Sequence, residues 1–351
     1  MKLLNDELYV EDLEYAARVD LPWEKLSSKS ILLSGATGMI GSFLIDVIMY
    51  KNKHDNLNCH VYAVGRNEDK ARNRFETYWE NNNFDFIQHD VNKPMDGLKL
   101  NTINYVLHLA SNTHPMAYST DPIGTITTNI MGVYNMLEFS TTVNADRMAF
   151  ASSNEIYGEN RGDVEKFDEK YLGYIDCNTM RAGYPESKRC GEALCQAYIA
   201  QKGLDVVIPR LTRSYGPTLL NSDTKALSQF LKKGLAHEDI VLKSAGTQYY
   251  SYTYVADAVV GLLTVLLCGE KGEAYNISDE ASDIMLKDLA AIIAKASGTK
   301  VVFDVPDAVE AAGYSTATKA RLDNRKITEL GFKAKYDIET GISRTLKIME
   351  E

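Results

Sequence analysis

A tyrosine and a lysine four residues apart lie just past the middle of the chain, within the run Arg181-Ala-Gly-Tyr-Pro-Glu-Ser-Lys-Arg. Residues at this spacing share one face of a helix, so Tyr184 and Lys188 are expected to lie together. Pro185 suits the first turn, which predicts that the helix begins at Tyr184. An ammonium group beside a phenol stabilises the phenolate and is expected to lower the pKa of Tyr184. Such a tyrosine can take the proton of an alcohol while a hydride leaves the same carbon.

A glycine-rich run provides the second chemical candidate. An apolar strand at residues 30–34 leads into Gly35-Ala-Thr-Gly-Met-Ile-Gly, and an apolar helix is expected from 42 to 49. In such a run the first glycine permits a tight turn, the second lets the backbone approach a pyrophosphate, and the third permits close helix packing. Free N–H groups at the start of the helix then bind phosphate. The residues expected to hold a dinucleotide here are Gly35, Thr37, Gly38, Met39, Ile40 and Gly41.

The end of the second predicted strand bears on which dinucleotide binds. That strand covers residues 59–64 and is followed by Gly65 and Arg66. Proteins that prefer NAD usually carry an acid at this point to hold the ribose hydroxyls. Gly65 leaves space instead, and Arg66 could contact the 2′-phosphate of NADP. An arginine that stacks on the adenine, or that is simply exposed, explains the residue nearly as well.

Alternating strand and helix patterns indicate the fold around these candidates. Further strands are expected at residues 84–91, 105–111, 148–153 and 206–211, with helices at 125–141 and 186–200. This alternation predicts an α/β fold of the Rossmann type, a doubly wound parallel sheet with helices on both faces. Ligands of such sheets bind at the carboxyl ends of the strands. The candidate residues there are Asp90 and Val91 beside the adenine, Leu109, Ala110 and Ser111 along the cofactor, and Ser153 near Tyr184.

The same patterns divide the chain into an arm and two domains. Residues 1–29 form an N-terminal helical arm, which is expected to pack on a neighbouring domain or subunit. Residues 30–210 form the dinucleotide-binding domain, and residues 256–270 return to it. Residues 211–255 and 271–351 form mainly a smaller, mixed α/β substrate-binding domain. The elements predicted after residue 210 are helices at 226–235 and 257–267 and strands at 239–243, 249–255 and 273–277.

Composition and charge narrow the classes of partner. The formal net charge of −10 and the pI near 5.2 argue against nucleic acid or an anionic membrane. The five cysteines are scattered without the spacing of a disulfide framework or a metal site, so no metal is expected. The N-terminus is too acidic and too interrupted for a signal peptide, and no apolar run reaches membrane-spanning length. A reduced, cytoplasmic protein is therefore expected.

Taken together, these motifs resemble the extended short-chain dehydrogenase/reductase family, also called the NAD-dependent epimerase/dehydratase family, from Ser30 to the C-terminus. The matching motifs are GATGMIG at 35–41, HLAS at 108–111, SS and YG within 152–158, YPESK at 184–188, RSYGP at 213–217 and YVADA at 254–258. The resemblance implies a seven-stranded Rossmann domain, bound NAD, a nucleotide-diphosphate sugar as substrate, and a homodimer.

Within this family the chain looks most like the UDP-glucuronate decarboxylases. The similar features are residues 108–111, Tyr118, the 121–129 segment and Glu155, which matches a glutamate of decarboxylases and some dehydratases. The chain also departs from the family pattern at three places. Gly65 and Arg66 replace an Asp-Asn pair, Asn154 stands where dTDP-glucose dehydratases carry an aspartic acid, and Tyr250 stands where members usually carry an arginine.

The resemblance implies a role for each catalytic candidate. Tyr184 would remove the proton of a sugar 4-hydroxyl, Lys188 would hold the nicotinamide ribose, and Ser153 would hydrogen-bond the same oxygen. Asn129 would connect Lys188 to water. The resulting 4-ketone acidifies C5–H, so Glu155 would act as the base for elimination of the C6 hydroxyl or for inversion at C5. A C6 carboxylate would instead leave as carbon dioxide, because it lies β to the ketone.

Substrate contacts are implied for Asn112, Tyr118, Asn154, Arg213 and Tyr250. Arg213 is expected to replace the missing cation at position 250 and to bind the diphosphate, since a guanidinium matches phosphate geometry. A competing interpretation pairs Arg213 with a protein carboxylate, in which case the substrate is not a nucleotide-diphosphate sugar at all. Two other functions stay open, an NADPH-dependent carbonyl reductase and a non-catalytic nucleotide-sensing module. Retention of the serine, tyrosine and lysine counts against the sensor, which needs no acid–base pair.

Overall fold

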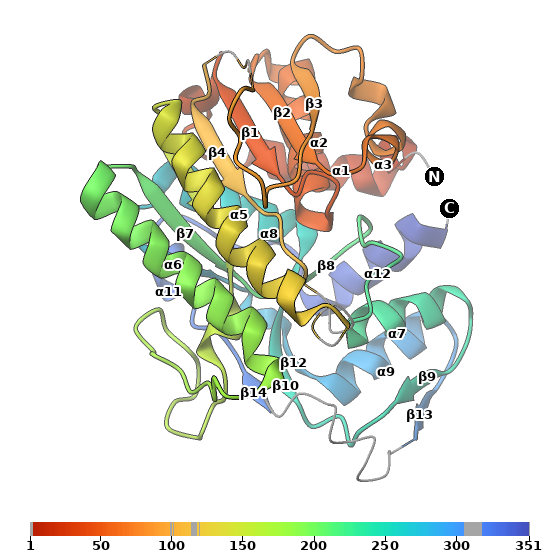
Figure 1. Ribbon diagram of the computed structural model, residues 1–351. Coiled ribbons are helices and arrows are strands. Elements are labelled where there is room, and N and C mark those ends of the chain that lie inside the picture. Colours follow the sequence, from red (N-terminus) through yellow and green to blue (C-terminus); the bar gives the residue numbers. More distant parts are fainter. Residues whose placement is uncertain are drawn as a thin grey trace.

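The computed structural model describes residues 3–98, 100, 102–113, 118, 120–304 and 318–350. A parallel sheet lies at the centre, in the strand order β11-β7-β5-β4-β1-β2-β3, with β6 beside β7 (Figure 1). Its strands are β1 Ser30–Ser34, β2 His60–Gly65, β3 Phe84–Gln88, β4 Tyr105–His108, β5 Arg147–Phe150, β6 Ser152–Ser153, β7 Val206–Leu211 and β11 Ala274–Ile277. The parallel pairing of these strands confirms the Rossmann-type sheet that the alternating pattern predicts.

Two strands are shorter than the sequence pattern predicts. β3 ends at Gln88, opposite the last residue of β2, and β4 ends at His108, opposite the last residue of β1. The ladder pairing ends at these residues, and Asp90, Val91 and residues 109–111 lie in loops at the carboxyl edge. The single strand predicted at 148–153 is likewise divided into β5 and β6.

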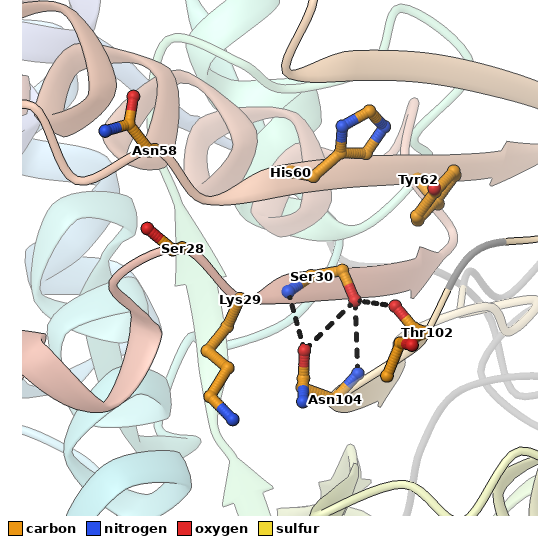
Figure 2. A pocket seen from close by; sticks show the side chains of 8 residues that line it. All are labelled: Ser28, Lys29, Ser30, Asn58, His60, Tyr62, Thr102 and Asn104. Carbon is orange, nitrogen blue, oxygen red and sulfur yellow. Dashed lines mark hydrogen bonds between the residues drawn. The ribbon is translucent and has the colours of Figure 1, made fainter.

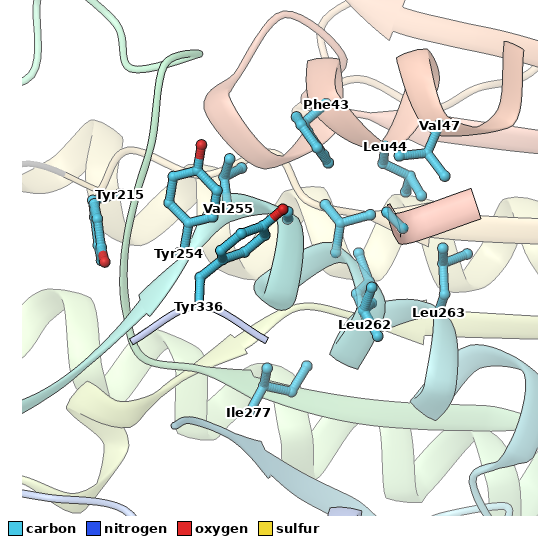
Figure 3. Packing of buried hydrophobic residues seen from close by; sticks show 14 of the residues in the cluster. Phe43, Leu44, Val47, Tyr215, Tyr254, Val255, Leu262, Leu263, Ile277 and Tyr336 are labelled. Atoms are coloured by element: carbon cyan, nitrogen blue, oxygen red, sulfur yellow. The ribbon is translucent and has the colours of Figure 1, made fainter. Parts of the chain in front are cut away.

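Helices cover both faces of the sheet, which explains why the central strands β1 and β4 are buried along their whole length. The main ones are α2 Met39–Asp55, α5 Pro122–Thr142, α6 Gly183–Lys202 and α8 Val255–Cys268, with the shorter α3 Glu68–Arg74 after β2. Alternate residues of β1 point to different cores. Ile31 and Leu33 belong to the core that contains α2 and α8, and Leu32 belongs to the core that contains α5. Figure 3 shows the first core, where Phe43, Leu44 and Val47 of α2 lie near Leu262 and Leu263 of α8.

The N-terminal arm packs on helices of its own chain. It comprises the 3-10 turns η1 Leu3–Asn5 and η2 Trp23–Leu26 and the helix α1 Glu7–Arg18, which contacts α2 and α8. The hydroxyl of Tyr9 donates to the buried Asp46 of α2, and Arg74 of α3 binds the same carboxylate. Tyr254 donates a hydrogen bond to Asp12 from the other side of the arm. The arm is therefore anchored by buried ionic contacts as well as by apolar packing.

The second domain is built around the aromatic strand β10 Tyr249–Tyr254, which pairs with β12 Asp283–Met285, β14 Lys319–Ala320 and β8 Arg213–Tyr215. Its other elements are α7 Ala226–Leu235, β9 Ile240–Leu242, α9 Leu286–Ala296, β13 Val301–Phe303, α11 Arg325–Thr328 and α12 Ile338–Glu350. The remaining 3-10 turns are η3 Glu76–Tyr78, η4 Asn154–Tyr157, η5 Met180–Ala182 and η6 Glu280–Ser282. β11 lies inside the range predicted for this domain, yet it pairs with β7 and forms the edge of the main sheet.

Within the described part of the chain, no helix combines the length and the apolar character that crossing a membrane requires. Nor do the described residues include a group of three or more histidine, cysteine, aspartate or glutamate side chains arranged to hold a metal ion.

Candidate active site

Tyr184 and Lys188 lie in the first turns of α6, which begins one residue before the predicted start. Both side chains are buried at the carboxyl edge of the sheet. The Nζ atom of Lys188 donates to the carbonyl oxygen of Ala151, 2.8 Å away, and lies 5.0 Å from the ring centroid of Phe150. The lysine is therefore fixed against the end of β5, on the same helical face as the tyrosine.

The expectation that Lys188 lowers the pKa of Tyr184 is wrong for this structure. Burial raises the pKa of Tyr184 to about 12, although hydrogen bonds with Ser153 and Ser111 oppose the shift. Burial also lowers the pKa of Lys188 to about 8. The cause is that both groups are removed from water, which disfavours the charged form of each. The lysine cation is in addition held by the carbonyl of Ala151.

A chain of polar side chains joins α5 to α6 beneath this pair. The hydroxyl of Ser111 donates to Oδ1 of Asn129 at 2.6 Å, and Nδ2 of Asn129 donates to Oγ of Ser187 at 2.9 Å. Ser187 donates in turn to the carbonyl oxygen of Tyr184 at 2.8 Å. Asn129 thus contacts two serines rather than Lys188, and it positions the start of the catalytic helix. Ser187 was missed from sequence, although it lies within the YPESK motif.

Glu155 lies between two arginines. The N–H of Glu155 donates to Oγ of Ser153 at 3.2 Å, which fixes the glutamate at the start of η4. Arg181 donates from Nη2 to Oε2 of Glu155 at 2.9 Å, and Nη2 of Arg213 lies 3.7 Å from Oε1. Both carboxylate oxygens therefore face a guanidinium group. Sequence reasoning missed Arg181, for which the one available sign was its position three residues before the catalytic tyrosine.

Arg213 lies against Tyr250, the residue that stands where family members usually carry an arginine. The guanidinium carbon of Arg213 is 3.7 Å from the ring centroid of Tyr250, on the adjacent strand β10. The contact with Glu155 agrees with the competing interpretation, in which Arg213 pairs with a protein carboxylate. However, Nη1 of Arg213 is buried without a hydrogen-bond partner in the described residues. One donor is thus left for a ligand, as the diphosphate interpretation requires.

Of the remaining substrate candidates, Tyr118 lies against Tyr184. The ring of Tyr118 stacks on that of Tyr184, with centroids 5.0 Å apart, and Arg181 lies 4.8 Å from the Tyr118 centroid. Asn154 is buried at the start of η4, and Asn112 is half-buried in the loop after β4. The site accordingly combines an acid–base tyrosine with aromatic and cationic side chains.

The glycine turn beside this site fits a dinucleotide. Gly35 has a positive φ of 75°, and a Cβ atom there would lie 2.8 Å from the backbone nitrogen of Ala110. A Cβ at Gly41 would lie 2.4 Å from the carbonyl oxygen of Gly35, so both positions require glycine. α2 begins at Met39 without a side-chain cap, which leaves the N–H groups of its first turn available for phosphate.

A separate polar hollow lies at the opposite, amino edge of the sheet. Figure 2 shows its lining residues, Ser28, Lys29, Ser30, Asn58, His60, Tyr62, Thr102 and Asn104. The hollow is away from the carboxyl edge, where parallel sheets bind their ligands, and none of the catalytic candidates contributes to it.

Comparison with known proteins places this geometry in context. A sequence profile described as the NAD dependent epimerase/dehydratase family matches residues 31–278. The chain is 30% identical to UDP-glucuronic acid decarboxylase 5 of Arabidopsis thaliana over 329 residues, 93% of this chain and 89% of the relative. It is 33% identical to UDP-glucuronic acid decarboxylase 1 of Xenopus tropicalis over 239 residues, a match that spans 68% of this chain but only 53% of that relative.

Solved structures share the fold. UDP-glucose 4-epimerase from Thermotoga maritima, with UDP-glucose, superposes with a TM-score of 0.78 at 22% identity, covering 91% of this chain and 98% of the other. UDP-glucuronic acid 4-epimerase from Bacillus cereus, in complex with UDP-glucuronic acid and NAD, has a TM-score of 0.74 at 22% identity, with coverages of 91% and 98%. At this level of identity the structural likeness concerns the fold.

Proposed function

The chain belongs to the NAD dependent epimerase/dehydratase family, and on that premise we propose that it decarboxylates a nucleotide-diphosphate uronic acid, with UDP-glucuronate as the first candidate. It is an NAD(P)-dependent enzyme of nucleotide sugars. When bound, the oxidised nicotinamide supplies a hydride acceptor and a positive charge. Tyr184 takes the proton of the 4-hydroxyl, and Ser153 hydrogen-bonds the oxygen that becomes the ketone. Lys188 holds the ribose from its position on the same face of α6.

The carboxylate at C6 then lies β to the new ketone. The bond between C5 and C6 breaks, carbon dioxide leaves, and the electron pair remains as an enolate at C5 and C4. C5 would then take up a proton from water, C4 would regain the hydride, and Tyr184 would return its proton to the 4-oxygen, so that the net change is loss of carbon dioxide and uptake of one proton. With the nicotinamide oxidised at both the start and the end of the cycle, no external reductant would be consumed.

The surroundings of Glu155 are the observation that carries this proposal. Elimination of the C6 hydroxyl and inversion at C5 both need a free base, whereas loss of carbon dioxide does not. The two oxygens of Glu155 face Arg181 and Arg213, at 2.9 and 3.7 Å. A carboxylate held in this way is poorly placed to take a carbon-bound proton. We infer that Glu155 orients the arginines toward an anionic substrate.

A panel of nucleotide sugars tests the proposal. The protein, supplied with NAD or NADP, is incubated with UDP-glucuronate, UDP-galacturonate, dTDP-glucose and GDP-mannose, and the products are identified by NMR. We expect a pentose product and release of labelled carbon dioxide from a uronic acid carrying carbon-13 at C6. The Tyr184→Phe variant is the control for a contaminating activity.

Other products would overturn decarboxylation in distinguishable ways. A C4-inverted sugar that keeps its carboxylate indicates an epimerase, and a 4-keto-6-deoxy sugar indicates a dehydratase. Stoichiometric oxidation of NADPH at 340 nm by added ketones indicates a carbonyl reductase. Binding of nucleotide sugars without any turnover indicates a sensor.

We further propose that two copies associate through α5 and α6, which pack side by side on one face of the sheet (Figure 1). Large apolar side chains are exposed along this surface, namely Ile123, Met131 and Tyr134 on α5 and Met180 just before α6. Their burial against a second copy would remove apolar area from water. Light scattering tests the idea, because Tyr134→Glu should shift a dimer toward monomer, whereas Tyr174→Glu, at another exposed aromatic, should not.

A further inference from the structure

Glu192 continues the catalytic face of α6 by one further turn. It follows Tyr184 and Lys188 at the same spacing of four residues, so the three side chains lie in a row on one face of the helix. The carboxylate of Glu192 accepts from the hydroxyl of Ser152 at 2.5 Å. The residue before that serine is Ala151, whose carbonyl oxygen accepts from the Nζ atom of Lys188 at 2.8 Å. The lysine and the glutamate therefore bind adjacent residues between β5 and β6, which brings their opposite charges together.

Arg210 fixes the Glu192 carboxylate from the neighbouring strand. It lies on β7, opposite Ser152 of β6 in the sheet register. Its Nε atom donates to Oε1 of Glu192 at 3.0 Å, and its Nη2 atom donates to Oε2 at 2.7 Å, so the guanidinium holds both carboxylate oxygens. The two side chains are only 10% and 15% exposed, so water competes little for either charge.

The remaining donor of Arg210 is also engaged. Nη1 donates to the hydroxyl oxygen of Tyr157 at 2.8 Å and to the carbonyl oxygen of Glu169 at 2.9 Å. Tyr157 is the last residue of η4, and its own hydroxyl donates to Oδ1 of Asn276 on β11 at 2.7 Å. The carboxylate is thus held from β6 and β7 and, through the arginine, from η4, so it cannot turn away from the lysine without breaking these contacts.

The other titratable groups packed around this row are neutral near neutral pH or bound elsewhere. Burial and the charge of Lys188 lower the pKa of His108 on β4 to about 3. Burial raises the pKa of Cys195, further along α6, and that of Tyr157. Glu169 accepts from the backbone N–H of Asn276 at 2.8 Å. Burial also lowers the pKa of Lys188, and the charge of the neighbouring carboxylate on α6 opposes that shift.

We propose that Glu192 is a positioning residue for Lys188, and that its carboxylate, fixed by Ser152 and Arg210, keeps the lysine protonated and directed at the end of β5. The inference rests on the proposed function only for the role of the lysine at the nicotinamide ribose. A buried ion pair adds little net stability, because removing both charges from water offsets their attraction. A fixed negative charge one turn behind a buried ammonium group is instead what holds that group in its charged form.

NMR of protein labelled with carbon-13 at the lysine Cε atoms tests the proposal without any substrate. The Lys188 signal is the one missing from Lys188→Met, and its chemical shift is followed against pH. We expect a midpoint near 8 in the wild type and about one pH unit lower in Glu192→Gln, whose amide keeps the shape of the side chain but not its charge. Arg210→Met should raise the midpoint instead, because it leaves the carboxylate without its guanidinium.

Asp205→Asn is the matched control. Asp205 lies just before β7 and pairs at 2.9 Å with Arg147, the first residue of β5, so this ion pair joins the same two strands at the amino edge of the sheet. Its removal should leave the Lys188 midpoint unchanged.

Two results would overturn the proposal. The first is an unchanged Lys188 midpoint in Glu192→Gln. The second is an equal fall in Asp205→Asn or in Arg210→Met, because the shift would then reflect a general loosening of the fold. A lower midpoint confined to Glu192→Gln supports the positioning role even if the sugar panel shows no turnover, so failure of the proposed function is distinguished from failure of this inference.

Discussion

Two clusters of carboxylate, arginine and tyrosine in this molecule differ in how completely their polar groups are paired. In the arm cluster, Tyr9 and Arg74 both hydrogen-bond Asp46, whose side chain is fully buried. In the catalytic cluster, Glu155 faces Arg181 and Arg213 beside Tyr118 and Tyr184, and the Glu155 side chain is 27% exposed.

The difference lies in charge as well as in pairing. The arm cluster balances one carboxylate with one guanidinium. The catalytic cluster sets two guanidinium groups against one carboxylate, and Nη1 of Arg213 has no partner in the described residues. A balanced, buried cluster holds elements together, whereas an unbalanced and accessible one is complete only with an anionic ligand. Substitutions in the two clusters should therefore affect different measurements.

The largest effect is expected for Tyr184→Phe. Loss of a positioned proton-transfer group should lower the rate about 10²- to 10⁴-fold, while the melting temperature stays close to that of the wild type. The matched variant in the arm cluster is Tyr9→Phe, which should lower stability and leave the rate unchanged. Near-normal turnover by Tyr184→Phe on the substrate identified by the panel would remove the tyrosine from the mechanism.

Arg74→Ala should have the next largest effect, on stability. It leaves the carboxylate of Asp46 buried without its cation, which typically destabilises a protein by about 3–5 kcal/mol. Urea unfolding monitored by circular dichroism measures the loss. The double variant Arg74→Ala/Asp46→Asn should recover part of it, because the uncompensated charge is gone. An Arg74→Ala protein as stable as the wild type would contradict the structural role of the arm cluster.

Arg213→Ala should act on binding instead. We expect about 10- to 100-fold weaker affinity for the substrate, with the change in unfolding free energy smaller than for Arg74→Ala. Calorimetry with UDP and UDP-glucuronate locates the contact. Equal losses for the two ligands indicate the diphosphate, and a loss confined to UDP-glucuronate indicates the carboxylate. Unchanged affinity for both would mean that Glu155 is the sole partner of Arg213.

The two clusters should also differ in their pH dependence. The expected effect is smaller than those above, about a tenfold change in kcat/KM per pH unit. Since the pKa of Tyr184 is raised to about 12 and that of Lys188 lowered to about 8, kcat/KM should rise with pH below 8 and level off above it. Above 8, gain of phenolate and loss of the lysine cation offset each other. Stability should rise between about pH 8 and 10, because unfolded Lys188 binds a proton there that the folded state does not, and above pH 10 the raised pKa of Tyr184 opposes this gain. A rate that falls together with stability above pH 8 would argue against this assignment.

The sequence predicted the elements of the fold better than the contacts of the site. Apolar periodicity and glycine spacing are local features, so the strands, the helix of Tyr184 and the glycine turn could be identified from them. The partners of Glu155 could not, because Arg181 and Arg213 come from distant segments that meet only in the folded chain. The pKa of Tyr184 was predicted in the wrong direction for a related reason. Helical spacing revealed the nearby lysine, whereas the burial that outweighs it depends on the whole structure.

The arm also has a consequence for the order in which the chain matures on the ribosome. Arg344 donates to Asp12, a residue 332 positions earlier in the chain, and Tyr15 donates to Asp257, 242 positions later. At about 5–20 residues per second, Asp12 is made on the order of 20–60 s before its arginine partner. Until α8 is made, the apolar face of α1 has only α2 of its two main helix partners to pack on. α1 is thus synthesised long before its contacts with Asp257 and Arg344 can form.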